Sequence, residues 1–176
     1  MRLLGAVLAG GESRRFGSDK ALALLDGKPL IQHAVDALAA QTDAVIVCGR
    51  DWGDGLPDRP EPGLGPLGGI AAALHEAARR GYDAVLTTPC DVPGLPTDLV
   101  RRLGDGGVLA EMPVIGLWPT ALAASLDAWL RDGRDRSVRG WARAAGLAEI
   151  RLGTRLANIN RPADLDEAVR GGRTQD

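Results

Sequence analysis

An uninterrupted apolar run at residues 3–8, followed directly by a glycine-rich basic loop, constrains the fold of this chain more than any other feature. The run lacks the polar alternation of a half-exposed strand, which is typical of a strand buried on both faces of a parallel sheet. In open α/β sheets, ligands bind where loops leave the carboxyl ends of such strands. The sequence therefore predicts an α/β protein whose first strand ends at a binding loop.

The loop over residues 8–20 has the composition of an anion site. Its glycines free backbone N–H groups for close approach to an anion, because no Cβ intervenes and positive φ is accessible. It also carries three cations, Arg14, Arg15 and Lys20. Backbone donors and cations together suit a polyphosphate, because they offset charge that grows in a transition state. We therefore expect a nucleoside triphosphate here, with a solvated surface turn as the alternative interpretation.

Two common phosphate motifs do not explain this loop. The Walker pattern requires Gly-Lys-Ser/Thr, whereas Gly17 precedes Ser18 and Lys20 precedes Ala21. A Gly-x-Gly-x-x-Gly match occurs at residues 63–68, but it follows a proline-rich stretch that cannot be a central strand. The prediction of phosphate binding therefore depends on the position of the loop after a buried strand.

Composition excludes several classes of protein. The chain has 176 residues, which fits one domain with a sizeable core, and we expect a single domain over 1–176. A net charge of −2 provides no basic field, so neither nucleic acid nor a membrane is expected as a partner. The two cysteines, Cys48 and Cys90, lack metal-binding spacing to each other or to the two histidines. No signal-peptide pattern or membrane-spanning run is evident, so we expect a cytoplasmic protein.

The rest of the chain alternates between helical and strand patterns. The apolar spacing predicts helices over 29–41, 67–80, 96–103, 119–130 and 137–145, and a last helix from Pro162. Apolar runs predict strands over 44–48, 83–88, 107–111, 113–118 and 149–152. Glycine and proline over 51–65 predict a loop with one short strand near Leu56, and 171–176 is expected to be a frayed tail.

Asp91 is the strongest candidate outside the first loop. It follows the strand expected over 83–88 and is flanked by prolines. A carboxylate at this point is a hard oxygen ligand for Mg²⁺ that is also bound to triphosphate oxygens, but a helix or turn cap is an equally good interpretation. Lys20 likewise is either a phosphate ligand or the partner of Asp19 in a surface ion pair.

Four separated blocks share their order and spacing with a known family. They read Leu-Ala-Gly-Gly-x-Ser-x-Arg-x-Gly-x-Asp-Lys-Ala-Leu from residue 8, Gly-Pro-Leu-Gly-Gly-Ile from 65, Thr-Pro-Cys-Asp-Val-Pro from 88, and Asn-Ile-Asn-Arg-Pro-Ala-Asp-Leu from 158. In these blocks the chain resembles the molybdenum cofactor guanylyltransferases of the nucleotidyltransferase superfamily. The resemblance implies a three-layer Rossmann-like α/β fold with a mostly parallel central sheet. It also implies a nucleotide-binding half over 1–93 and a pterin-substrate half over 94–170.

The resemblance further implies roles for individual residues. Arg15 and Lys20 would contact the phosphates, and Asp91 would hold Mg²⁺, the expected cofactor; these three are the expected catalytic residues. Backbone groups of four residues would contact the nucleotide, namely Leu8, Ala9, Gly10 and Gly11.

Three more positions carry roles implied by the family. Asp58 would contact the nucleotide, with Glu61 as the competing acidic residue. Asn158 and Asn160 would lie beside the pterin, although both residue types also form turns and caps. Cys48 stands where some relatives have an asparagine near the guanine base, which leaves the base contacts there open.

The resemblance implies transfer of GMP from GTP to molybdenum-molybdopterin, with release of pyrophosphate. The two substrates are the expected partners, together with molybdoenzyme maturation proteins. Two alternatives are a cytidylyltransferase that uses CTP and a nucleotide-binding maturation protein without turnover. The first is disfavoured because cytidylyltransferases typically have Leu-Ala-Ala-Gly where this chain has Leu-Ala-Gly-Gly from residue 8.

Overall fold

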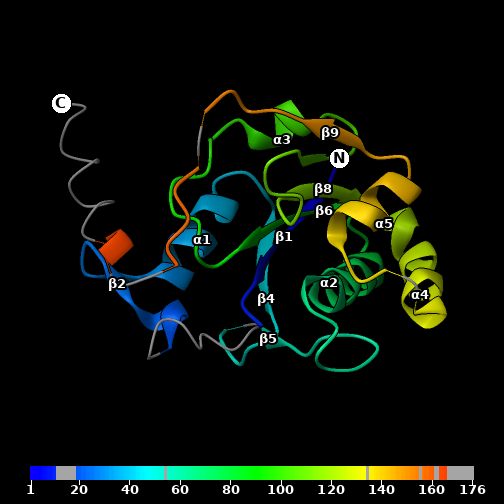
Figure 1. Cartoon of the computed structure of the whole chain (residues 1–176), viewed down its shortest axis with the longest axis horizontal. Coiled ribbons are helices and arrows are strands. Elements are labelled where there is room, and N and C mark those ends of the chain that lie inside the picture. The colour runs from blue at the N-terminus through cyan, green and yellow to red at the C-terminus, as the bar shows by residue number, and fades with distance from the viewer. Residues whose placement is uncertain (11–18, 54, 134, 155, 161–162, 166–176) are drawn as a thin grey trace.

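A seven-stranded sheet forms the centre of the molecule (Figure 1). The structure is a computed structural model that describes residues 1–10, 19–53, 55–133, 135–154, 156–160 and 163–165. The strands lie in the order β5-β4-β1-β6-β8-β7-β9. Their bounds are β1 Leu3–Leu8, β4 Ala44–Cys48, β5 Gly55–Leu56, β6 Ala84–Pro89, β7 Gly107–Leu109, β8 Gly116–Pro119 and β9 Ala148–Ile150.

The first four strands in this order run parallel. β1 pairs with β4 on one side and β6 on the other, and β4 pairs with β5. β8 is antiparallel to both β6 and β7, whereas β9 is parallel to β7. The prediction of an α/β fold with a mostly parallel central sheet is therefore confirmed.

Helices cover both faces of the sheet and give three layers (Figure 1). One face is covered by α1 Leu30–Ala39 and α3 Leu99–Leu103. The other face is covered by α2 Pro66–Arg80, α4 Ala123–Asp132 and α5 Val138–Ala144. Within the described part of the chain, no helix combines the length and the hydropathy that a membrane crossing requires.

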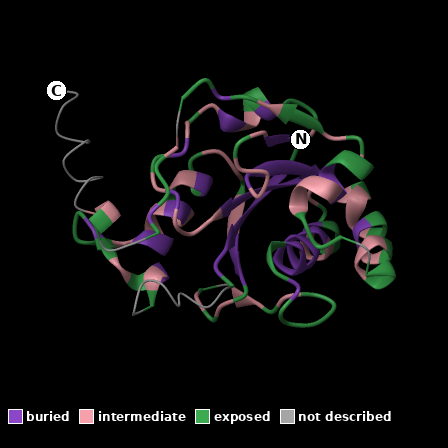
Figure 2. Cartoon of the chain, viewed as in Figure 1, coloured by how far each residue is buried: buried purple, intermediate pink, exposed green. Residues whose placement is uncertain are grey.

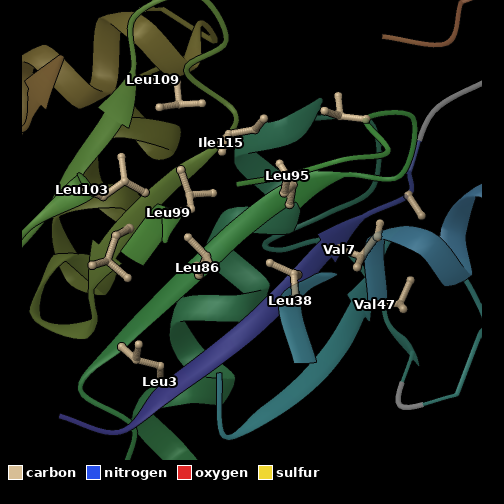
Figure 3. Close-up of a cluster of buried hydrophobic side chains, with 14 of the residues drawn as sticks. Leu3, Val7, Leu38, Val47, Leu86, Leu95, Leu99, Leu103, Leu109 and Ile115 are labelled. Atoms are coloured by element: carbon tan, nitrogen blue, oxygen red, sulfur yellow. The ribbon is translucent and has the colours of Figure 1, made fainter. Parts of the chain in front are cut away.

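Alternate residues of β1 enter two different cores. Leu3 and Val7 join the cluster under α1, which Figure 3 shows together with Leu38, whereas Leu4 and Ala6 join the cluster under α2. The strand is buried along its whole length (Figure 2). Because both faces are covered, both sets of alternating side chains must be apolar, and this accounts for the unbroken apolar run in the sequence.

The antiparallel strand β8 is fixed by a tryptophan. Trp118 pairs with Val85 across the sheet and stacks on Trp141 of α5, with ring centroids 5.0 Å apart. Its indole N–H donates to Thr87 Oγ1 at 2.8 Å, so this buried polar group is satisfied. These contacts attach the second half of the sheet to β6.

A small hairpin before α1 was not predicted. β2 Leu24–Leu25 and β3 Lys28–Pro29 pair antiparallel around Asp26 and Gly27, which have φ of 50° and 75°. An Asp-Gly pair with positive φ at both positions is the usual two-residue hairpin turn. The dipeptide is therefore a turn signal that the sequence already contained.

Several predicted bounds differ from the structure. The helix expected over 96–103 is limited to Leu99–Leu103, and the one expected over 119–130 begins as a 3-10 turn, η2 Thr120–Leu122, before α4. The predicted short strand near Leu56 is confirmed as β5. Pro162 and the tail 171–176 lie outside the described residues, and residues 163–165 are helical.

Candidate active site

Four parallel strands deliver their following residues to one edge of the sheet. The register aligns Leu8 with Cys48 and Pro89, and Cys48 with Leu56, so the four strands end at the same level. The residues just beyond these ends are Asp58 after β5, Gly49 and Arg50 after β4, Ala9 and Gly10 after β1, and Cys90 and Asp91 after β6. α1 and α2 lie on opposite faces of this sheet, which makes this edge the topological switch point where open α/β sheets bind ligands.

An ion pair joins two of the expected catalytic residues. Lys20 Nζ lies 2.6 Å from Asp91 Oδ2, and their side chains are only 13% and 21% exposed. Lys20 begins the 3-10 turn η1 Lys20–Leu22. The pairing of Lys20 with Asp19 considered from the sequence is wrong, because Lys20 reaches across to the end of β6 instead. Partial burial strengthens such a pair, since less water screens the charges.

The 158–160 segment lies against the same cluster. Asn160 Oδ1 accepts a hydrogen bond from Lys20 Nζ at 3.1 Å, and the buried Ile159 donates its backbone N–H to Asp91 O at 2.9 Å. The backbone N–H of Asn160 donates to Asp164 Oδ2 at 2.7 Å. Asn158 is exposed, and its side chain makes no hydrogen bond to another described residue. Of the two asparagines, the structure therefore brings only Asn160 to the ion pair.

Asp58 lies in a different environment, surrounded by glycines. A Cβ added to Gly10, Gly49 or Gly69 would lie 3.3 to 3.7 Å from its carboxylate oxygens, and one added to Gly68 would lie 3.1 Å from its Cβ. Gly68 and Gly69 are in the first turn of α2, and Gly68 accepts a hydrogen bond from the Arg59 backbone N–H. Absent side chains at these four positions leave the backbone close to the carboxylate.

The Asp58 carboxylate has no hydrogen-bonding partner among the described residues. Burial raises its pKa above the ordinary value of 3.8. Glu61, the competing acidic residue, is exposed on the loop that follows. The structure therefore brings Asp58, and not Glu61, to the end of β1.

Gly10 and Gly49 approach so closely that only glycine fits at position 49. A Cβ on Gly49 would lie 2.5 Å from Gly10 Cα, and Gly49 has φ of 81°, which is accessible mainly to glycine. The backbone hydrogen bonding between β1 and β4 continues beside this contact, since the Ala9 N–H donates to Cys48 O at 2.9 Å. Leu8 and Ala9 are both buried at this point. Gly11 and Arg15, which the family resemblance singled out, lie outside the described residues.

One charged residue at this edge was missed from the sequence. Arg50 binds Asp19 with both terminal nitrogens, at 2.5 and 2.6 Å. The Arg50 guanidinium lowers the pKa of Asp19, so this pair persists at neutral pH. Its position in the sequence could have identified Arg50 as a site residue, because it follows the carboxyl end of β4 just as Asp91 follows that of β6.

The two cysteines of the edge are not nucleophiles. Burial, with Asp58 nearby, raises the pKa of the Cys48 thiol to about 12. Burial and Asp91 raise the pKa of Cys90 to about 11, although Lys20 and Arg50 act in the opposite direction. Only the thiolate attacks efficiently, so both groups are inert near neutral pH.

The donor set at Asp91 fits a metal that substrate helps to hold. No cluster of three or more His, Cys, Asp or Glu side chains occurs among the described residues. Mg²⁺ is usually bound by one or two carboxylates together with substrate phosphates and waters, so a single aspartate at a phosphate site is sufficient. The chemistry at this edge is therefore suited to transfer of a phosphate-containing group.

Comparison with known proteins agrees with this geometry. A family profile described as "MobA-like NTP transferase domain" matches residues 5–146. The chain belongs to the MobA-like NTP transferase family. A protein of Cereibacter sphaeroides named "Molybdenum cofactor guanylyltransferase" is 41% identical, and the match covers 96% of each chain. One of the same name in Rhodobacter capsulatus is 39% identical over 96% of this chain and 95% of that protein.

Solved structures show the same fold. A chain of Archaeoglobus fulgidus described as "Molybdopterin-guanine dinucleotide biosynthesis protein A" superposes with a TM-score of 0.76 at 20% identity, covering 98% of this chain and all of that one. The 2-C-methyl-D-erythritol 4-phosphate cytidylyltransferase of Thermus thermophilus gives a TM-score of 0.69 at 17% identity, covering 99% of both. The MobA-like chain therefore has the architecture of nucleotidyltransferases with different substrates.

Proposed function

We propose that this MobA-like protein transfers GMP from GTP to the terminal phosphate of molybdenum-molybdopterin and releases pyrophosphate. Relatives named for that activity match nearly its full length at 34–41% identity. The observation that carries the proposal is the Lys20–Asp91 ion pair at the carboxyl ends of β1 and β6. A cation and a potential metal ligand at one point are what a triphosphate requires.

The nucleotide would lie along the strand ends, with its phosphates at Lys20 and its base at Asp58. β5 and β6 are separated by three interstrand spacings of about 4.8 Å, or about 14 Å, a span that an extended nucleoside triphosphate covers. Gly10 and Gly49 lie between these ends and leave the backbone bare for the ribose and phosphates. The Asp58 carboxylate would accept hydrogen bonds from the guanine N1–H and N2–H, since an ionised carboxylate is acceptor-only.

The chemistry we propose is in-line attack by the terminal phosphate oxygen of the pterin substrate on the α-phosphorus of GTP. The bond from the α-phosphorus to the bridging oxygen breaks, and pyrophosphate leaves with its electrons. Lys20 would leave Asp91 for the phosphates and offset their charge, and Arg15 is proposed to do the same. Mg²⁺ held by Asp91 would neutralise further phosphate charge. No covalent intermediate on the protein is required, and positioning of the two substrates supplies much of the acceleration.

The pterin substrate is proposed to lie beside Asn158 and Asn160. Asn160 already contacts Lys20, so a group bound there is adjacent to the phosphate end. The exposed Asn158 leaves its amide free for such a ligand. This arrangement would bring the attacking phosphate to the α-phosphorus from the β6 side.

The direct test compares GTP with CTP in the presence of Mg²⁺ and molybdenum-molybdopterin. We expect pyrophosphate release and a guanine dinucleotide product with GTP, and little turnover with CTP. A clear preference for CTP would overturn the guanylyl assignment. Tight GTP binding without any pyrophosphate release would instead favour a maturation protein without turnover.

A further inference from the structure

Two consecutive residues are tied to strand ends on opposite sides of β1. Lys20 pairs with Asp91, which follows β6, and Asp19 pairs with Arg50, which follows β4. The Asp19 side chain also accepts from the Ala21 N–H at 3.3 Å and so caps η1. The start of η1 is thereby fixed from two directions.

The backbone that carries Arg50 is itself held firmly. The Gly49 N–H donates to Leu56 O at 2.8 Å, which extends the pairing of β4 with β5. The chain then turns so tightly that a Cβ on Gly55 would lie 2.4 Å from Arg50 O. These contacts tie the backbone at Arg50 to β5.

The Arg50 side chain is committed to Asp19. It is 24% exposed, and its Nε is buried without a hydrogen-bonding partner among the described residues. The two charge-assisted hydrogen bonds to Asp19 form a bidentate pair, which is a strong contact, and they offset the cost of the unsatisfied Nε. Among the described residues, no negative group other than Asp19 accepts from Arg50.

The same dipeptide contacts both described residues that flank positions 11–18. Gly49 packs against Gly10, and Arg50 binds Asp19. The residues that follow β4 thus contact the last described residue before positions 11–18 and the first described residue after them. Lys20, the first residue of η1 after the return, takes its position from the same contact.

We propose that Arg50 is a positioning residue that, through Asp19, holds Lys20 in place to bind the triphosphate. This inference extends the proposed nucleotidyl transfer and shares its assumption that Lys20 contacts phosphate. Lys20 must exchange Asp91 for phosphate when the nucleotide binds, whereas the Arg50–Asp19 pair can remain intact. Because η1 is fixed, the Lys20 ammonium would stay near the phosphates and would not move away with Asp91 or into solvent. Less conformational entropy would then be lost when GTP binds.

The first test replaces Arg50→Gln and, separately, Asp19→Asn. Both changes remove the ion pair, and the asparagine keeps an oxygen that can cap η1. We expect each variant to weaken Mg²⁺–GTP binding about tenfold, below the roughly 100-fold that a misplacement of about 1 Å can cost. The double variant should lose no more than either single one, because the two act as one unit. Unchanged affinity in both single variants would overturn the proposal.

The second test separates positioning from direct contact or general structural support. In a Lys20→Met background, adding Arg50→Gln should cause no further loss of GTP affinity, because the group being positioned is gone. A further tenfold loss there would mean that Arg50 contacts the nucleotide itself or supports the site as a whole, and would contradict the proposal.

A matched control is Arg79→Gln, which removes a bidentate pair with Glu76 near the far end of α2. It should leave GTP affinity unchanged. Melting temperatures of the variants should stay close to that of the wild type, because partly exposed ion pairs contribute little to stability. If the wild type binds CTP in place of GTP, the guanylyl assignment fails, and the same variants measured with CTP still test the role of Arg50.

Discussion

The two carboxylates at the carboxyl edge of the sheet differ in their surroundings. Asp91 is neutralised by Lys20 at 2.6 Å, and Asn160 completes the cluster. Among the described residues, Asp58 is surrounded by glycine backbone and makes no hydrogen bond through its carboxylate, and burial raises its pKa. One end of the site therefore holds balanced charges that phosphates and a metal can enter, whereas the other holds an acceptor to which no described residue donates. This difference supports the proposal that the two ends bind opposite ends of one nucleotide.

The pKa of the cysteine near each carboxylate reflects the same difference in surrounding charge. Asp58 adds to the effect of burial at Cys48, whose pKa rises to about 12. Asp91 acts in the same direction at Cys90, but Lys20 and Arg50 oppose it, and the pKa rises only to about 11. Among the described residues, cations therefore oppose the carboxylate beside Cys90 but not the one beside Cys48.

Removing the carboxylate at the phosphate end should have the largest effect. Asp91→Asn keeps the shape of the side chain but removes its charge, so neither Mg²⁺ nor Lys20 is held as before. We expect kcat for GMP transfer to fall by about 100-fold to 1000-fold, as when one group that stabilises transition-state charge is lost. Steady-state pyrophosphate release measures this, with circular dichroism to show that the fold is retained. Activity within twofold of the wild type would remove Asp91 from the mechanism.

Changing the carboxylate at the base end should have an intermediate effect, a loss of nucleotide preference. Asp58→Asn replaces one acceptor by a donor, so the preference for GTP over other triphosphates should fall by about 10-fold to 100-fold, the size of one lost bidentate base contact. Competition binding with GTP, ATP and CTP measures the loss. An unchanged preference would show that Asp58 does not recognise the base.

The same variant should be slightly more stable than the wild type. Because the folded protein holds the pKa of Asp58 above its unfolded value, the ionised carboxylate costs stability that grows as the pH rises through this range. Asp58→Asn removes that cost at neutral pH, and the difference should vanish below the ordinary pKa of 3.8. Melting curves at acid and neutral pH measure it, with an expected gain of no more than about 2–4 °C. A lower melting temperature at neutral pH would contradict the assignment of a half-buried carboxylate without a partner among the described residues.

Thiol reactivity should give the smallest difference between the two ends. Cys90 is half-buried and has the lower pKa, so iodoacetamide should label it faster than the buried Cys48. Mass spectrometry of peptides from mildly alkaline reactions measures both rates. Faster labelling of Cys48 would mean that the end of β4 is more open than the structure shows.

Local sequence patterns predicted the parts of the fold that depend on burial. The apolar runs at β1 and β6 and the second half of β4 are buried, and the residues that follow these three strands lie at the same edge of the sheet. The Asp26-Gly27 turn was missed because the flanking strands have only two residues each, too few to show alternation.

Local patterns could not predict which charged residues form ion pairs with one another. Lys20 lies beside Asp19 in sequence, yet it pairs with Asp91, 71 positions away, and Asp19 pairs with Arg50. These pairings depend on the register that aligns Leu8 with its neighbours and on the direction in which η1 leaves the sheet. Neither quantity is encoded by residue spacing, so the ion pairs that build the site emerge only from the folded chain.

The most direct measurement is a crystal structure with a non-hydrolysable GTP analogue and Mn²⁺, which takes the same oxygen ligands as Mg²⁺ and can be located by anomalous scattering. We predict the metal at about 2.0–2.2 Å from an Asp91 carboxylate oxygen, and the guanine edge within about 3 Å of Asp58. A nucleotide bound with its phosphates near Asp58, or away from the carboxyl ends of β1 and β6 altogether, would contradict the account.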